Sequence, residues 1–384
     1  MLPASAAAIA ASGCDQGHQD DEPTTSGPFI TFLGSNVAVH GLVNAGDAGP
    51  DAPTGSVVIQ LAFDRVLNPL TVNRQSFALL DGDHNPVSVG PVITYDPVAR
   101  VVRLEAPMGG AWITPGGLYY IELGIPAAGS LVGGIRAFDG ATLDPSLPAN
   151  ALTVDFQTCP TAGCADGAVV APDPPDPTPP DFCRDVLPIF AQHCTAGACH
   201  GSISGSQLPS EGLILDSYAG VANTAINRSS EESNTGPLSG VSEATGTFGL
   251  DMKIIDPGSS ATSWIIYKML LAPARALLPD GGDPEPSVRV LCSDGGPGDL
   301  PVDPFQDTDG GPLPPSAAPY TVLSDNERAL LANYVLGQPM PYPNTPGIAQ
   351  TPADPSLLSF DEMERIQTWI SSGAQTQDCG SCQP

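Results

Sequence analysis

The chain has 384 residues, of which 41% are hydrophobic, and it carries a formal net charge of −29 with only 13 lysine and arginine residues. So acidic a surface repels phosphate backbones and argues against nucleic-acid binding. The length allows two domains, each with a core of its own, and the 42 glycines and 43 prolines predict many turns and at least one stiff linker. No run of 18 apolar residues occurs, so the sequence predicts no membrane-spanning helix.

The first segment, residues 1–27, is a run of small apolar residues that ends at Gly13-Cys14 and continues as a polar stretch. This pattern predicts the remnant of a signal peptide with a lipoprotein cleavage site, in which lipid on Cys14 anchors the chain and the polar stretch is a tether. The usual basic opening segment is missing, so the alternatives are a start codon further upstream or a merely disordered terminus. The lipoprotein interpretation predicts a cell-envelope location, in the periplasm or at the outer membrane or cell surface.

Residues 28–158 alternate between short β-branched or aromatic runs and turn sequences. The runs lie at 57–63, 76–80, 92–95, 101–106 and 118–123. Several short strands at this spacing predict an antiparallel β-sandwich.

Three motifs in this segment, Phe63-Asp64, Tyr95-Asp96 and the Pro115–Tyr119 corner, resemble those of a bacterial Ig-like domain. The resemblance implies a spacer or adhesion module and no active site.

Residues 159–181 are rich in proline and aspartate, and such a segment extends as polyproline II and is expected to hold two domains apart. From residue 182 to 384 the pattern becomes helical with long loops. Two late segments begin with Ser324/Glu327 and Ser359/Glu362, each a capping box at the start of a helix. The expected fold class is therefore an N-terminal all-β Ig-like sandwich followed by a mainly α cytochrome c-like domain.

The chemistry-bearing motif is Cys194-x-x-x-x-Cys199-His200. Covalent haem attachment needs two thiols for the vinyl groups and an adjacent histidine for the iron, usually spaced C-x-x-C-H. Here the spacer has four residues, all of them small, which would let the extra two bulge outward. The motif alone fits equally well a short disulfide loop beside an ordinary histidine.

The motif and four segments after it resemble, in order, the planctomycete-type cytochrome c domain. The segments are Gly212–Asp216, Pro257–Ser263, Met340-Pro341 and Trp369–Ala374. The resemblance implies haem c bound covalently by Cys194 and Cys199, with His200 and Met340 as the axial iron ligands. A long acidic segment, 279–319, and the four-residue spacer depart from the family pattern.

Other residues offer weaker alternatives for the iron. Met252 and Met269 are rival thioethers, although Met269 lies in an apolar run typical of a core, and His193 is expected on a helix face. Electron transfer to a redox protein in the cell envelope is the function that the resemblance implies. The alternatives are a non-haem adhesion or scaffold protein, in which the motif is a disulfide loop, and a haem enzyme such as a peroxidase, which would need an open sixth position.

The remaining cysteines are even in number, as expected for an exported protein with disulfides. They are Cys159, Cys164, Cys183, Cys292, Cys379 and Cys382. Their connectivity does not follow from the sequence, and pairing in chain order is the arrangement that we expect: Cys159–Cys164, Cys183–Cys292 and Cys379–Cys382. A redox or zinc role for the terminal Cys379-x-x-Cys382 and a calcium loop at Asp307–Asp309 are minor alternatives.

Overall fold

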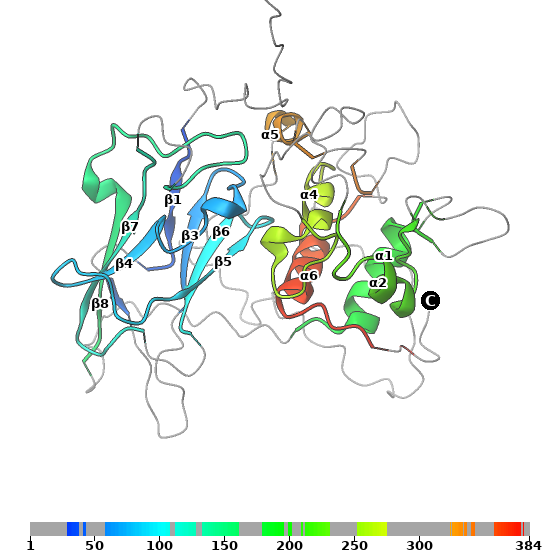
Figure 1. The fold of residues 1–384 in the computed structure, drawn as a ribbon, viewed down its shortest axis with the longest axis horizontal. Helices are drawn as coiled ribbons and strands as arrows, with labels where there is room; N and C mark the ends of the chain where they lie inside the picture. Colours follow the sequence, from blue (N-terminus) through cyan, green and yellow to red (C-terminus); the bar gives the residue numbers. More distant parts are fainter. Residues whose placement is uncertain are drawn as a thin grey trace, which may run out of the picture.

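The computed structural model contains a β-region, residues 29–160, and a C-terminal region, residues 179–379, which lie side by side (Figure 1). Neither region, where it is described, holds a helix that is long and apolar enough to cross a membrane. The structure describes residues 29–37, 41–43, 58–107, 112–127, 133–160, 179–195, 199–201, 209, 212–230, 252–274, 323, 325–332, 334–335, 339–341, 357–377 and 379.

The β-region is built from two four-stranded sheets, with strand orders β1-β3-β6-β5 and β2-β8-β7-β4. Their facing sides share one apolar core that contains Phe63, Phe77, Tyr119 and Phe156. The strands are β1 (Phe32–Ser35), β2 (Gly41–Val43), β3 (Ile59–Phe63), β4 (Phe77–Asp81), β5 (Val92–Asp96), β6 (Val101–Glu105), β7 (Leu118–Leu123) and β8 (Thr153–Thr158).

The second sheet corrects the expectation of a wholly antiparallel sandwich. Strand β2 pairs with β8 in parallel, with Gly41 opposite Phe156 and Val43 opposite Thr158. The first sheet is antiparallel throughout its described pairs. A three-residue edge strand is too short to leave a periodic signal in the sequence, so its direction could not be predicted.

The C-terminal region contains short helices joined by turns and isolated bridges, so the expected fold class, with its mainly α cytochrome c-like domain, is wrong. Among the described residues, four α-helices have seven residues each and α6 has 12. A helix of seven residues is about two turns long, so these helices depend on packing for their stability. The described elements are the π-helical turn η3 (Phe182–Val186), the 3₁₀ turn η5 (Ser260–Thr262), and helices α1 (Leu187–His193), α2 (Tyr218–Thr224), α4 (Trp264–Leu270), α5 (Asp325–Leu331) and α6 (Phe360–Ser371).

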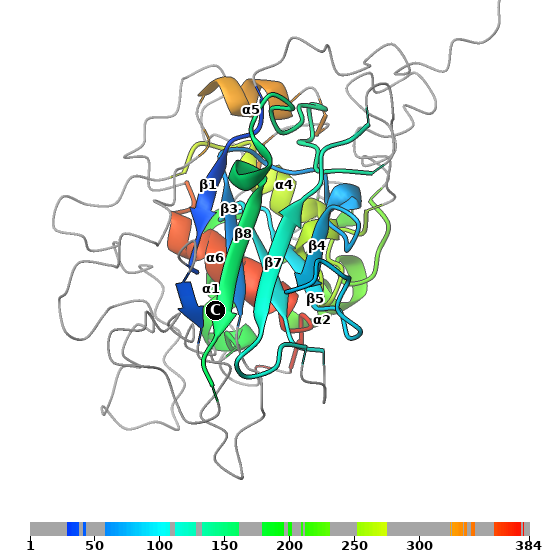
Figure 2. The same ribbon diagram turned by 90° about the vertical axis from the view of Figure 1, so that its left-hand side faces the viewer.

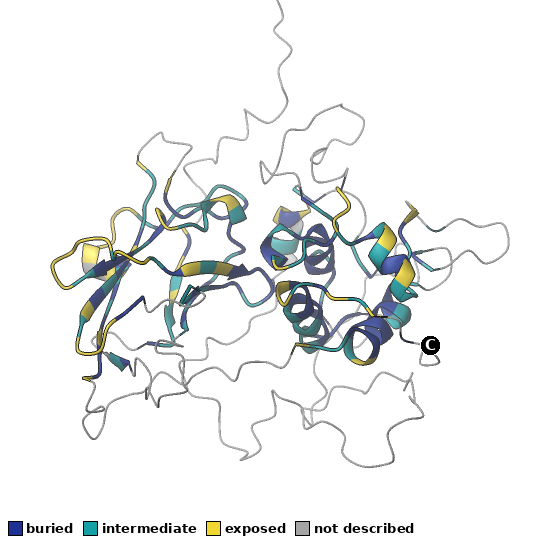
Figure 3. Ribbon diagram, turned by 60° about the horizontal axis from the view of Figure 1, so that its bottom comes forward, coloured by how far each residue is buried: buried dark blue, intermediate teal, exposed yellow. Residues whose placement is uncertain are grey.

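Helix α6 organises the core of the C-terminal region. The predicted capping box at its start is confirmed: the Ser359 side chain accepts from the Glu362 amide, and the Glu362 carboxylate accepts from the Ser359 amide. Trp369 then packs against Phe182 and Phe190, with ring centroids 5.4 and 6.2 Å away. Figure 3 shows buried residues, in dark blue, along the helices of this region and on the strands of the β-region. The other predicted capping box begins at Ser324, which lies outside the described residues.

The two regions are in direct contact, although the proline-rich segment was expected to hold them apart. Figures 1 and 2 show the helices against the β1-β3-β6-β5 sheet. Phe138 packs edge-on against Tyr334 at 5.3 Å, and Arg100 forms an ion pair with Glu327 at 3.3 Å. Val66, Val98 and Phe138 of the β-region belong to the same apolar cluster as the C-terminal helices. The interface therefore forms part of the fold.

Candidate functional site

The segment that carries the cysteine-histidine motif begins where α1 ends. The Cys194 amide donates to the Phe190 carbonyl at 2.8 Å, so Cys194 closes the last turn of the helix. Cys194 is buried and Cys199 is half-buried. The structure describes 194–195 and 199–201 but not residues 196–198.

The described cysteines fall into two classes. Cys183 and Cys379 form a disulfide between η3 and the segment after α6, and Cys159 is also disulfide-bonded. Cys194 and Cys199 are free. The expected pairs Cys183–Cys292 and Cys379–Cys382 are therefore wrong, because the helix η3 and the end of the chain are brought together by the packing of Trp369, which sequence spacing does not reveal.

The free thiols of Cys194 and Cys199 are relevant to the alternative hypothesis that the motif is a disulfide loop. In that arrangement Cys194 and Cys199 would be bonded to each other, and they are not. Burial raises the pKa of the Cys194 thiol to about 12, and the nearby Cys199 and Glu362 contribute to the rise. Cys194 is thus a protonated thiol close to a second one.

The backbone of His200 is held by two hydrogen bonds, one at its amide and one at its carbonyl. Its amide donates to the Cys194 carbonyl at 3.0 Å, and its carbonyl accepts from the Leu215 amide at 2.7 Å. A Cβ atom on the following residue, Gly201, would lie 3.1 Å from the Thr195 carbonyl and 3.6 Å from Asp216 Oδ2. The motif and the segment 212–216 are therefore packed against each other, with glycine at the closest approach.

The other segments of the family resemblance meet around the same core. The Gly258 amide donates to the Ile370 carbonyl at 2.8 Å, which joins segment 257–263 to the end of α6. Met340 is half-buried, and its amide donates to the Lys268 carbonyl at 3.0 Å, which joins it to α4. This hydrogen bond leads to α4 and not to the motif. The rival sulfur ligands Met252 and Met269 are both buried in the core.

Sequence reasoning missed the partner of His193, which precedes the motif. His193 Nε2 lies 3.1 Å from Glu362 Oε1, and both side chains are buried. Glu362 thereby ties the end of α1 to the start of α6. The sequence singled out Glu362 as a capping residue and His193 as a helix-face residue, but their 169-residue separation gave no signal that they meet.

Several expected site residues lie outside the described residues: Cys14, Cys164, Cys292, Cys382 and the Asp307–Asp309 segment. Among the residues that are described, no three histidine, cysteine or acidic side chains gather as a metal site would require. No family model, no curated protein and no solved structure matches the chain.

Proposed function

We propose that the chain is an exported c-type cytochrome, with haem c held covalently by Cys194 and Cys199. One observation carries the proposal: both cysteines of the motif are free, whereas the other described cysteines are disulfide-bonded. In an oxidising compartment, close thiols form a disulfide unless another bond consumes them. Thioether attachment is that bond.

The donor set suits the proposed group. Two thiols, an imidazole and a thioether are the ligands that attach and coordinate a c-type haem. His200 would be the proximal ligand, because its backbone is held between Cys194 and Leu215. Met340 would be the second protein ligand of the iron, as the family resemblance implies, and its backbone is hydrogen-bonded to α4.

The remaining residues would prepare and shield this site. The His193–Glu362 pair fixes the end of α1, and so the backbone position of Cys194. The buried aromatic cluster of Phe182, Phe190 and Trp369 excludes water behind it. When bound, the haem would supply one-electron transfer at iron, with a redox protein in the cell envelope as partner. The β-region would serve as a spacer, and Cys14 as the lipid anchor.

The pyridine haemochrome spectrum of the protein, exported from cells with a haem-maturation system, tests the proposal. We expect the spectrum of a thioether-linked haem in the wild type, its loss in Cys194→Ser and Cys199→Ser, and retention in His84→Ala. His84 is a suitable control because it is exposed and stacks on Tyr120 in the β-region. A wild-type protein without haem, purified in folded form, would refute the proposal and favour a non-haem surface protein.

A further inference from the structure

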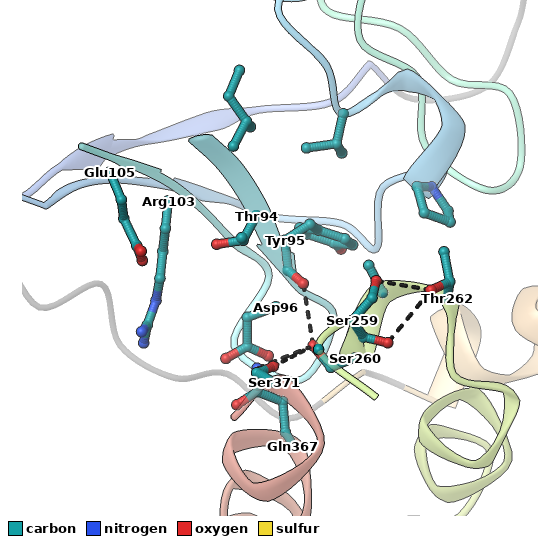
Figure 4. Close-up of a pocket in the computed structure, with 15 residues that line it drawn as sticks. Thr94, Tyr95, Asp96, Arg103, Glu105, Ser259, Ser260, Thr262, Gln367 and Ser371 are labelled. Atoms are coloured by element: carbon teal, nitrogen blue, oxygen red, sulfur yellow. Dashed lines mark hydrogen bonds between the residues drawn. The ribbon is translucent and has the colours of Figure 1, made fainter. Parts of the chain in front are cut away.

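A polar pocket of about 350 Å³ lies between the two regions, away from the cysteine-histidine motif (Figure 4). One wall is the outer face of the first sheet. Thr94 pairs with Arg103 across β5 and β6, and Asp96 and Glu105 lie on the same face by strand alternation. These residues point away from the sandwich core, toward the C-terminal region.

The opposite wall is a polar stripe of α6. Gln367 and Ser371 line the pocket, and their spacing of four residues places them on one face of the helix. The apolar stripe of the same helix, with Ile366 and Trp369, packs into the core. Helix α6 therefore turns a polar side to the polar side of the sheet.

Hydrogen bonds hold the floor of the pocket in place. Ser260 Oγ donates to the Tyr95 carbonyl at 3.3 Å, and it is bonded to Gln367 Nε2 and Ser371 Oγ, each at 3.1 Å. Thr262 Oγ1 is bonded to Ser259 Oγ at 2.8 Å. Figure 4 shows this network linking β5, η5 and α6. The pocket is thus built before any ligand enters.

Two buried polar atoms of the residues that line the pocket have no hydrogen-bond partner among the described residues: Asp96 Oδ2 and Arg103 Nε. Asp96 is only 1% exposed, and its other oxygen, Oδ1, accepts from the amides of Val98 and Ala99. Leaving such atoms unsatisfied is unfavourable, because each has lost its hydrogen bonds to water. A molecule that satisfies them would recover part of that cost.

The charges at the pocket restrict the chemistry of that molecule. Arg103 and Glu105 place opposite charges on the same wall, so a ligand of either charge would meet a like charge there as well as an opposite one. A hydroxyl group both accepts from a guanidinium and donates to a carboxylate, without net charge. Pro69 and Val72 add an apolar side against which C–H groups can pack.

We propose that this pocket binds a neutral, hydroxyl-rich ligand of monosaccharide size. The volume falls in the range of small-molecule sites, and the few convergent polar groups would fix the orientation of the ligand. The site is independent of haem attachment. Burial raises the pKa of Asp96, which favours the protonated carboxyl group, a hydrogen-bond donor.

Calorimetric titration of the full chain with a panel of sugars tests the proposal. The neutral probes are glucose, galactose and mannose, and the charged counterparts are glucosamine and glucuronate. We expect at least one neutral sugar to bind, and to bind more tightly than its amine and acid derivatives. If a neutral trisaccharide binds more tightly than its monosaccharide, the natural ligand is the end of a glycan. If the two bind equally, the natural ligand is a free sugar. Both outcomes support the proposal.

Variants locate the binding. Asp96→Asn and Gln367→Ala should each raise the dissociation constant about tenfold. This change corresponds to about 1.4 kcal/mol, the value of one lost hydrogen bond. The matched control Gln157→Ala, exposed on β8, should leave it unchanged. Absence of binding by every neutral sugar, with the pocket filled by ordered water only, would overturn the proposal. Tighter binding of glucosamine or glucuronate than of the neutral sugar, or an equal loss in Gln157→Ala, would overturn it as well.

Discussion

The β-region and the C-terminal region are stabilised in different ways. The β-region rests on two hydrogen-bonded sheets whose inner faces share a core. The C-terminal region has short helices that would not be stable alone, held by an aromatic cluster, one long-range disulfide and a buried His193–Glu362 pair. Regular backbone hydrogen bonding thus stabilises the β-region, and a few contacts between segments distant in the sequence stabilise the C-terminal region.

Removal of the aromatic side chain at the centre of the C-terminal core should have the largest effect on the stability of that region. Trp369→Ala leaves a cavity between Phe182 and Phe190 and should cost about 3–5 kcal/mol of unfolding free energy. Hydrogen exchange followed by mass spectrometry should show lost protection in α1 and α6, with β3, β6 and β7 still protected.

Phe156→Ala in the β-region is the matched control, with a similar cost in that region's core. It should reduce protection in the sheets first. Equal loss of protection in both regions, in either variant, would show that they unfold as one unit and would contradict the distinction.

The disulfide comes next in expected effect. Replacing both Cys183 and Cys379 with serine opens a link between residues 196 positions apart and should destabilise the C-terminal region by about 2–5 kcal/mol. Urea unfolding of the variant and of the wild type measures the difference. Unchanged unfolding midpoints would mean that packing alone holds η3 against the segment after α6.

The buried pair offers a smaller perturbation. Glu362→Gln weakens both the bond to His193 and the capping box, and should cost about 1–3 kcal/mol. Ser359→Ala removes the cap but keeps the His193 bond, at about 1 kcal/mol. Thermal unfolding of the two variants separates the contributions, and equal losses would show that the His193 contact contributes nothing.

The interface between the regions should give the smallest effect, visible as a pH dependence of stability. Burial, and then the nearby Asp96, raise the pKa of Glu364 in the folded protein. The folded state therefore binds more protons than the unfolded state, so this group's contribution to stability falls as pH rises from its unfolded pKa of about 4 through the folded value. Glu364→Gln should flatten the profile of melting temperature against pH above that point, and a profile unchanged by the substitution would contradict the assignment.

Local sequence signals predicted local structure well. Strands β3 to β7 fall on the runs identified by alternation, and α6 begins at its capping box, because these features depend on neighbours in the chain. The contacts that join distant segments left no such signal. The Cys183–Cys379 bond, the His193–Glu362 pair and the meeting of the α6 polar stripe with β5 and β6 all depend on packing.

The mainly α interpretation failed for a related reason. Helical segments at 186–193 and 358–370 correspond to α1 and α6, but among the described residues between them the helices α2, α4 and α5 have only seven residues each and occur beside turns and isolated bridges, such as Ile226 with Ile255. For the candidate site, the sequence identified the cysteine-histidine motif and the order of the segments that follow it. It could not distinguish a disulfide loop from a free pair, since that depends on the redox state of Cys194 and Cys199.

The most direct test of the proposed haem attachment is the intact mass of the exported protein, measured after reduction and denaturation. We expect a mass that exceeds the polypeptide by one haem. The added mass should map to the peptide that contains Cys194, Cys199 and His200, and it should be lost when both cysteines are changed to serine. A wild-type mass equal to the polypeptide alone, from cells that mature a control c-type cytochrome, would contradict the proposed attachment.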